Sequence, residues 1–524
     1  MPYDPPPHVT EHWVQTKPSA SGKRGMVVSQ SRDAAAAGVA ILNAGGNAID
    51  AAVATAFALA TMEPWNSGLG GIGFAMVHRA GQKSAEVVNF GPVASRNVRQ
   101  EQFPLTGRMT TDLFRWPEVQ DDRNIHGPHS AAVPSSVAGY EKLHATWGKL
   151  PLKDVMAPAV ALAKRGLPVD WFSTLKIAYS ASVLAKYPAS AGIYLKSGLP
   201  PLPPYQGAPV FLRQGNLPDT LERLQHAGLR DFYTGDIAAA LVRDCAAVGA
   251  VIDATDLANT KALIVPATEV AWRNGKTLQL ATGLTAAPTL TQVLEQMRGV
   301  TYGKTPDADW FKSLASILMQ AYADRLAGLG EADKDAAETC TTHLTTCDAE
   351  GNMVAVTTTL MSSFGSRVVL PETGVLLNNG IMWFDPRPGQ ANSIGPGRRP
   401  LTNMCPIILK DGDTPILAGG ASGGRRIMAA VFQLMTYLTD FEMDIDTAAH
   451  FPRIDVSSAD EITANNKLSP EILATLANLA PTELVEHGVM PINFACPNVI
   501  TISRDGTRRG VSDTVSPWSA ALAQ

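Results

Sequence analysis

The chain has 524 residues, a formal net charge of −5 and 45% hydrophobic residues. Only 17% of its residues are charged, so the composition favours a protein with a large buried core. The weakly acidic balance supplies no basic surface, and we therefore expect neither nucleic acid nor an anionic membrane as a partner. The longest largely apolar run, residues 51–62, has 12 residues, whereas a membrane-spanning helix needs roughly 20.

The start of the chain and its cysteines indicate a compartment. The first residues, MPYDPPPH, are rich in proline and lack the apolar core of a secretory signal. The five cysteines are odd in number, scattered, and without the short spacing of a zinc site, which is typical of reduced thiols. We therefore predict a cytoplasmic protein with no metal site and no cofactor.

Periodicity, capping residues and turn signals predict the elements in chain order. Residues 1–24, rich in Pro, Ser and Lys, are expected to form an extended arm, and residues 328–340 a polar linker. Asn47 is a good N-cap for the second helix, with Asp50 in its first turn. The predicted helices are 34–43, 47–62, 135–147, 152–165, 235–248, 290–297, 310–330 and 426–438, and the predicted strands are 74–78, 85–90, several after Thr341, 492–495 and 499–503.

The most informative stretch begins at Cys340 and reads CTTHLTTCDA. A tight polar turn and a β-branched run follow it at residues 350–359. This arrangement suits an N-terminal-nucleophile hydrolase, in which cleavage before a threonine frees an α-amino group that serves as the base for the threonine's own hydroxyl. Such a threonine needs no neighbouring histidine. Thr-rich strand starts are common, so an ordinary β-hairpin is the alternative for this stretch taken alone.

Further stretches of the chain occur in the same order as in a known protein family. They include GGNAIDAAVA at 45–54, SGLGGIGF at 67–74, VPSSVAG at 133–139, LLNN at 376–379, the Gly-Pro and Arg-Pro-Leu of 395–401, and GGASGGRR at 419–426. Together they resemble the γ-glutamyltranspeptidase family from about residue 25 to the C-terminus. The resemblance implies an α/β fold, a four-layer αββα sandwich, in which a large chain (25–340) and a small chain (341–524) form one composite domain.

The resemblance also implies the roles of the reacting groups. Thr341 aligns with the family's nucleophile, so self-cleavage is expected between Cys340 and Thr341, with Thr342 as the rival nucleophile. Thr359 aligns with the second threonine, which holds the nucleophile's hydroxyl. Gly423 and Gly424 match the paired glycines whose N–H groups form the oxyanion hole; a flexible turn is the alternative.

The chain departs from the family where relatives bind the charged groups of a γ-glutamyl substrate. Val88 stands where the family has a clamp arginine, and the other clamp positions are occupied by Met361, Gly380, Trp383 and Asn403. An apolar pocket cannot pair a zwitterion, and an unpaired buried ammonium and carboxylate would cost several kcal/mol. The sequence therefore predicts that the reacting groups are kept and the specificity is changed.

A smaller substrate fits these departures. Met361 and Trp383 are expected to fill the space of the glutamyl backbone and to leave room for a small molecule beside the nucleophile. Asn403, Arg367 and Arg426 are the candidates for binding its carboxylate, although Arg426 has a second interpretation as a brace of the glycine turn and Arg367 as a solvated side chain. The combination resembles the oxamate amidohydrolases of bacterial purine breakdown, which convert oxamate and water into oxalate and ammonia.

The sequence is also consistent with other functions. The chain could be a γ-glutamyl hydrolase or transferase with an unusual clamp, a cephalosporin-acylase-like member, or an inactive member kept as a binding protein. The expected partners are the small amide substrate and the two chains of the precursor, with a dimer of heterodimers as a possible assembly.

Overall fold

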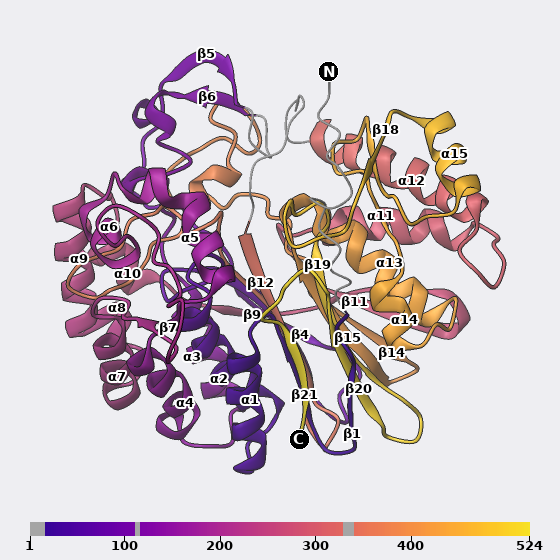
Figure 1. Ribbon diagram of the computed structural model, residues 1–524, viewed down its shortest axis with the longest axis horizontal. Coiled ribbons are helices and arrows are strands. Elements are labelled where there is room, and N and C mark those ends of the chain that lie inside the picture. Colours follow the sequence, from indigo (N-terminus) through magenta and orange to yellow (C-terminus); the bar gives the residue numbers. More distant parts are fainter. Residues whose placement is uncertain (1–15, 111–115, 328–339) are drawn as a thin grey trace.

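Two seven-stranded sheets lie face to face at the centre of the molecule, and helices cover their outer faces (Figure 1). This computed structural model describes residues 16–110, 116–327 and 340–524. One helical layer is built mainly from the N-terminal half of the chain, and the other includes α11 to α15 (Figure 1). The order helix, sheet, sheet, helix confirms the predicted four-layer αββα class.

Each large sheet joins segments that are far apart in the sequence, and its neighbouring strands are antiparallel. The first sheet has the order β1 (Ala20–Gly22), β20 (Arg508–Ser512), β19 (Cys496–Ile502), β15 (Thr414–Ser422), β14 (Ile407–Asp411), β11 (Lys276–Leu280) and β10 (Thr268–Ala271). The second has the order β21 (Ala520–Ala523), β2 (Met26–Ser29), β12 (Cys340–Cys347), β13 (Met353–Met361), β3 (Ile72–His78), β4 (Glu86–Phe90) and β9 (Leu263–Pro266).

The remaining strands form small sheets outside this pair. They are β16 (Ile454–Asp455), β17 (Ile462–Asn465) and β18 (Thr482–Val485), the pair β5 (Leu105–Met109) and β6 (Pro117–Val119), and the pair β7 (Leu167–Pro168) and β8 (Phe211–Leu212). The α-helices on the side of the second sheet include α1 (Arg32–Asn43), α2 (Ala48–Met62), α3 (Ser136–Trp147), α4 (Leu152–Arg165), α5 (Trp171–Leu184), α6 (Pro188–Tyr194), α7 (Leu217–Ala227), α8 (Asp231–Thr234), α9 (Asp236–Val248) and α10 (Ala254–Asn259). The others are α11 (Ala287–Arg298), α12 (Ala308–Ala327), α13 (Ile427–Thr439), α14 (Ile445–His450) and α15 (Pro470–Leu479).

The buried side chains fill three spaces between these layers. One cluster joins the second sheet to the helices of the N-terminal half, and a second joins the first sheet to α11, α12, α13 and α15. A third cluster, which includes Phe74 of β3 and Ile408 of β14, lies between the two sheets. Removing this apolar surface from water is the main force that holds the layers together.

The helix α2 shows why the GGNAIDAAVA stretch takes its form. Asn47 caps α2, and its side chain accepts hydrogen bonds from the N–H groups of Ile49 and Asp50. The Asp50 carboxylate bonds back to the Asn47 N–H, at 3.1 Å, and also accepts from Lys149 N–H at 3.0 Å. All residues of α2 are buried. A helix that is apolar all round belongs in the interior, and here it supports the sheet that carries Thr341.

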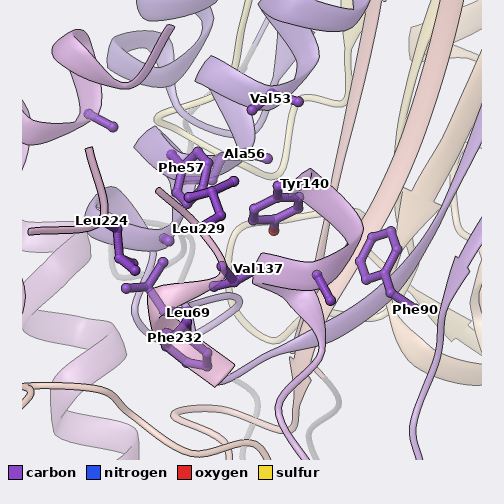
Figure 2. Close-up of a cluster of buried hydrophobic side chains, with 14 of the residues drawn as sticks. Val53, Ala56, Phe57, Leu69, Phe90, Val137, Tyr140, Leu224, Leu229 and Phe232 are labelled. Atoms are coloured by element: carbon purple, nitrogen blue, oxygen red, sulfur yellow. The ribbon is translucent and has the colours of Figure 1, made fainter. Parts of the chain in front are cut away.

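Aromatic side chains complete this helix–sheet layer. Figure 2 shows Phe57 of α2, Tyr140 of α3 and Phe90 of β4 among the buried side chains of the cluster. The rings of Phe57 and Tyr140 meet edge to face with centroids 5.0 Å apart, and Tyr140 donates to or accepts from Thr358 of β13 across 3.1 Å. The packing therefore fixes the strand that carries Thr359 from its outer face.

Most predicted helices and the strands beside Thr341 are confirmed, but residues 492–495 are not a strand. The strand begins only at Cys496, because Pro491 and Asn493 favour a turn, and Ile492 and Phe494 line a cavity. The predicted arm lies outside the described residues up to residue 15, and Ala20–Gly22 form the edge strand β1. The predicted linker lies outside the described residues from 328 to 339.

The described residues lack two kinds of feature. Among residues 16–110, 116–327 and 340–524, no helix is both long and apolar enough to cross a membrane. The same residues contain no group of three or more His, Cys, Asp or Glu side chains that could hold a metal ion.

Candidate active site

Thr341 lies at the start of β12, where the strand pairing is irregular. Cys340 is opposite Met361 of β13, and the register shifts between Cys340 and Thr342. The Thr341 Oγ1 donates a hydrogen bond to Thr359 Oγ1 at 3.3 Å, and Thr359 Oγ1 also accepts from the Met361 N–H at 2.7 Å. The two predicted threonines therefore meet, and the second one fixes the hydroxyl of the first.

The neighbouring Thr342 has a different environment. It is 0% exposed, and its Oγ1 donates to the Glu63 carboxyl group at 2.8 Å. Thr341, in contrast, is 5% exposed and lines a cavity. Access to a small molecule is therefore greater at Thr341, which favours Thr341 over its rival as the nucleophile.

The cavity beside Thr341 is small and draws its walls from distant parts of the chain. Its volume is about 60 Å³. Its lining comes from the ends of β2, α2, β12 and β15, from α5, and from the segments around β19 and β20: Gln30, Glu63, Asn66, Phe172, Lys176, Thr341, Ser422, Gly423, Ile492, Phe494, Cys496, Val515 and Ser516. A site for a drug-sized ligand is typically several times larger, so this one suits a substrate of a few heavy atoms.

Gly423 and Gly424 form the turn that follows β15. Their φ angles are +132° and +62°, which favour glycine, and the turn continues into the short helix η7 (Gly424–Arg426). The turn is closed by hydrogen bonds from Arg426 N–H to the Gly423 carbonyl and from Ile427 N–H to the Gly424 carbonyl. It thus uses the glycine carbonyls rather than their N–H groups. Only Gly423 lines the Thr341 cavity, while Gly424 is buried.

Gly423→Ala is expected to reduce turnover by about 100-fold or more, since it keeps the N–H but should move it away from the oxyanion, and one oxyanion-hole donor is worth roughly 3 kcal/mol. The reason is steric: an added Cβ would lie 2.7 Å from Ala495 Cα, at a φ that side chains rarely adopt. Gly192→Ala is the matched control, because its Cβ would meet nothing within 4 Å. Steady-state rates and gel analysis of both variants check the prediction, and unchanged turnover in Gly423→Ala would contradict it.

Two ionisable side chains, Glu63 and Lys176, line this cavity. Burial raises the pKa of Glu63 to about 7, although hydrogen bonds from Thr342 and Asn66 and the charge of Lys176 oppose this effect. Lys176 of α5 is 8% exposed, with its Nζ 5.4 Å from the centre of the Phe172 ring. Among the described residues, the contacts of the Lys176 ammonium are with the Phe172 ring and with the charge of Glu63, and it has no hydrogen bond or salt bridge. The cavity therefore contains a buried cation with bonding capacity to spare.

His343 is the only histidine on β12, but its environment does not suit a base. Burial lowers its pKa to about 3. One ring nitrogen bonds Thr357 Oγ1 at 2.9 Å, and the other bonds Thr345 Oγ1 at 3.2 Å. Gly420 packs directly on the ring, where any Cβ would approach within 2.3 Å. His343 is therefore a neutral packing residue between the sheets.

The structure brings two of the predicted pocket residues together. Met361 and Trp383 both belong to the cluster between the sheets, together with Met382, and all three are at most 5% exposed. Met361 has a positive φ of +90° at the end of β13, and Trp383 ends the short helix η6 (Gly380–Trp383). Met361 is opposite Cys340 in the strand pairing, but neither Met361 nor Trp383 lines the Thr341 cavity, and their contact with substrate stays a prediction.

The three predicted carboxylate ligands do not line the Thr341 cavity. Asn403 accepts a hydrogen bond from Arg325 at 3.1 Å. The Arg367 guanidinium donates to Ser362 Oγ at 2.8 Å and to the Gly365 carbonyl at 2.7 Å, which holds its own turn together. Arg426 donates to the Ile492 carbonyl and therefore links the glycine turn to the cavity wall.

The prediction for Val88 is wrong in one respect. Its side chain is 0% exposed and packs in the helix–sheet cluster, not in the space between the sheets. Because successive side chains of a strand point to opposite faces, its neighbour Asn89 faces the other way, toward Gly283. Val88 therefore contributes to the core and does not shape a pocket.

Sequence reasoning missed Glu63, Lys176 and Arg325. Glu63 precedes the glycine-rich stretch, where the sequence indicates a turn. Lys176 lies on α5, a helix that the sequence pattern did not predict. Arg325, near the end of α12, donates to the Thr402 carbonyl at 2.7 Å as well as to Asn403, and burial lowers its pKa to about 10. The only available signal was chemical: each is a charged side chain within a largely apolar segment.

A larger cavity, of about 570 Å³, lies beside the segment that precedes β19. His487 lines it, with its Nε2 3.0 Å from the Asp513 carboxylate and 2.9 Å from the Arg453 guanidinium. Thr341 and Gly423 are not part of its lining. Size alone therefore does not identify the reaction site in this protein.

The chain is similar in sequence and in fold to known proteins. The model of the family described as gamma-glutamyltranspeptidase matches residues 34–340 and 330–522. The chain is 32% identical over 487 residues to the acylase ACY 1 proenzyme of Pseudomonas sp. (strain SE83), over 86% of this chain and 85% of that protein. It is 27% identical over 556 residues to the glutathione hydrolase proenzyme of Bacillus subtilis (strain 168), over 94% and 90%. The solved structure of cephalosporin acylase from Bacillus halodurans, 22% identical, superposes with a TM-score of 0.84 over 100% of this chain and 99% of that one, which shows the shared fold.

Proposed function

Because the chain belongs to the γ-glutamyltranspeptidase family of self-processing hydrolases, we propose that it hydrolyses a small acid amide, with oxamate as the best candidate. The observation that carries this proposal is the content of the Thr341 cavity. It is about 60 Å³ in volume and contains Thr341, Gly423 and the ammonium group of Lys176. A two-carbon acid amide has one group for each of them.

The reaction follows from these positions. After self-cleavage before Thr341, the freed α-amino group takes the proton of the Thr341 hydroxyl. The Oγ1 attacks the amide carbon, and the N–H of Gly423 stabilises the negative charge that develops on the carbonyl oxygen. Ammonia leaves, and an ester joins the acyl group to Thr341. Water then hydrolyses this ester, which releases the dicarboxylic acid and restores the hydroxyl.

The carboxylate end of the substrate is assigned to Lys176 in this proposal, in place of Asn403, Arg367 and Arg426. A buried ammonium without a hydrogen-bond partner among the described residues gains a charge-assisted bond when a carboxylate enters. Met361 and Trp383 remain candidates for an apolar wall on the Cys340 side. Asn403, with Arg325 beside it, is a second polar group at that end of the sheets.

An acylase or glutathione-hydrolase activity is the second candidate function. The names of the relatives favour it, since one is an acylase and another a glutathione hydrolase. Both kinds of substrate exceed the Thr341 cavity, so this function would need a second binding region. An apolar wall of Met361 and Trp383 would suit a side chain without charge better than a γ-glutamyl group.

Oxamate is expected to be hydrolysed with a kcat/KM at least about 100-fold above that of a γ-glutamyl anilide, because an apolar wall leaves the charged glutamyl backbone unpaired. Ammonia release from oxamate and anilide release from the γ-glutamyl compound are measured on the same self-cleaved preparation. A kcat/KM for the γ-glutamyl compound equal to or above that for oxamate would replace the proposal with the second candidate. Hydrolysis of neither would remove both.

A further inference from the structure

The first cleavage of the chain has no obvious base. Before cleavage the nitrogen of Thr341 belongs to the Cys340–Thr341 peptide bond, so the α-amino base of the mature enzyme does not yet exist. The Thr341 hydroxyl donates to Thr359 Oγ1, but a neutral hydroxyl cannot keep a second proton. His343 is bonded on both ring nitrogens, and burial holds its pKa near 3. Another group must accept the proton.

We infer that Glu63 accepts the hydroxyl proton of Thr341 during self-cleavage, through a water molecule in the cavity that both side chains line. The inference rests on the proposed assignment of Thr341 as the nucleophile. Glu63 is at the end of α2, is 1% exposed, and is the only carboxyl group among the residues that line this cavity. A water molecule occupies roughly 10–15 Å³, and the volume of this cavity on the same scale is about 60 Å³. The cavity therefore has room for a water molecule that relays the proton.

Hydrogen bonds hold the Glu63 carboxyl group in place. Thr342 Oγ1 donates to its Oε2 at 2.8 Å from β12, and Asn66 bonds it from the following turn. The strand that carries the nucleophile therefore also positions the proton acceptor, one residue further along. Movement of either group relative to the other is limited by the same strand.

The step balances without any added reagent. The O–H bond of Thr341 breaks as its oxygen bonds the Cys340 carbonyl carbon, and the proton passes through water to the Glu63 carboxylate. The C–N bond of the peptide then breaks, and the proton returns from Glu63 to the nitrogen of Thr341. The product is an ester at Thr341 with a free α-amino group, and a second water molecule hydrolyses that ester.

The charges around Glu63 determine how the step depends on pH. Lys176 of α5 lowers the Glu63 pKa, but burial dominates and raises it to about 7. The Cys496 thiol on β19 also faces it, and burial holds the pKa of that thiol well above its usual range, so the thiol is neutral. Asp513, beyond Cys496, is ion-paired with Arg453 at 2.5 Å and remains charged. The carboxylate form of Glu63 therefore increases as the pH rises through about 7.

Self-cleavage is measured on full-length chain made by cell-free synthesis, with a labelled pulse followed by a change of pH. For the native chain we expect the cleavage rate to rise with pH, to pass its midpoint near 7 and then to level off. Glu63→Gln is expected to slow cleavage by about 100-fold and to abolish that midpoint, as loss of general-base action does. Glu63→Asp should cleave at an intermediate rate with a shifted midpoint.

The controls separate this inference from the assignment on which it rests. Glu141→Gln removes another carboxyl group whose pKa burial raises, on α3, and should cleave at the native rate. Cleavage of Thr341→Ala would refute the nucleophile itself. The role of Glu63 alone would be refuted if Thr341→Ala stays uncut while Glu63→Gln cleaves at the native rate. It would also be refuted if Glu63→Gln cleaves slowly but keeps the midpoint near 7. If Glu63→Gln fails to fold in a thermal unfolding assay, the midpoint of Glu63→Asp decides: a shift supports the inference, and an unchanged midpoint overturns it.

Discussion

Thr341→Ala is expected to leave one uncut chain of 55.5 kDa, with a loss of amide hydrolysis of at least about 1,000-fold. The substitution removes the hydroxyl group that bonds Thr359 and lines the cavity with Gly423. It removes little volume, and the site is at the start of a strand, so the fold should persist. Denaturing gels and mass spectrometry of the chain termini measure the first effect, and ammonia release measures the second.

Thr342→Val is the matched control for this prediction. It removes the neighbouring hydroxyl, whose bond to Glu63 is 2.8 Å long, and keeps the shape of the side chain. This variant should still give two chains, 1–340 and 341–524, although more slowly because Glu63 loses a partner. A small chain that begins at residue 342, or uncut Thr342→Val beside cleaved Thr341→Ala, would assign the nucleophile to Thr342.

The parts of the fold that follow from local pattern were predictable. The cap at Asn47, the apolar run of α2 and the alternation of β3 all act within a few residues, so the sequence carries their signal directly. The order of the strands in the two sheets has no such signal. It places β21 from the C-terminus next to β2 from the N-terminus, and local periodicity does not encode that pairing.

The same limit applies to the site. Thr341, Thr359 and Gly423 could be predicted because a family motif surrounds each of them, and the structure places all three at one end of the sheets. Lys176 and Glu63 could not, since each becomes a site residue only when α5 and the end of α2 meet β12. The face of a strand residue was equally hidden at Val88, where a shift of one position decides between core and pocket.

Buried charges of this kind restrict what the cavity can accept. The Lys176 ammonium has the Phe172 ring on one side and the Glu63 carboxyl group within reach of its charge. An uncharged substrate of the same size would leave the ammonium without a bond, whereas a carboxylate would supply one. Selection against neutral amides is therefore a consequence of burial, and it does not require a close fit.

Lys176→Met is expected to reduce kcat/KM for oxamate by about 100-fold, chiefly through KM, because truncation of one partner of a buried charge pair typically costs 2–5 kcal/mol. Oxamide is the matched substrate: it has the same size, but an amide replaces the carboxylate. The native enzyme should strongly prefer oxamate, and the variant should lose that preference while its low rate on oxamide stays within a few-fold. Lys176→Arg keeps the charge and should recover part of the preference.

Lys164→Met controls for the loss of a lysine, because Lys164 is an exposed residue of α4 that pairs with Glu222 at 2.6 Å. It should leave both substrates unaffected. Each preparation is first analysed on a denaturing gel, so that rates refer to the self-cleaved form, since Lys176 also acts on the Glu63 pKa. If Lys176→Met lowers the rates on oxamate and oxamide equally, the ammonium serves Glu63 and the cleavage reaction, and the substrate carboxylate binds elsewhere. Arg325, beside Asn403, is then the next cation to test, because it is the guanidinium that bonds the Thr402–Asn403 loop at the same end of the two sheets.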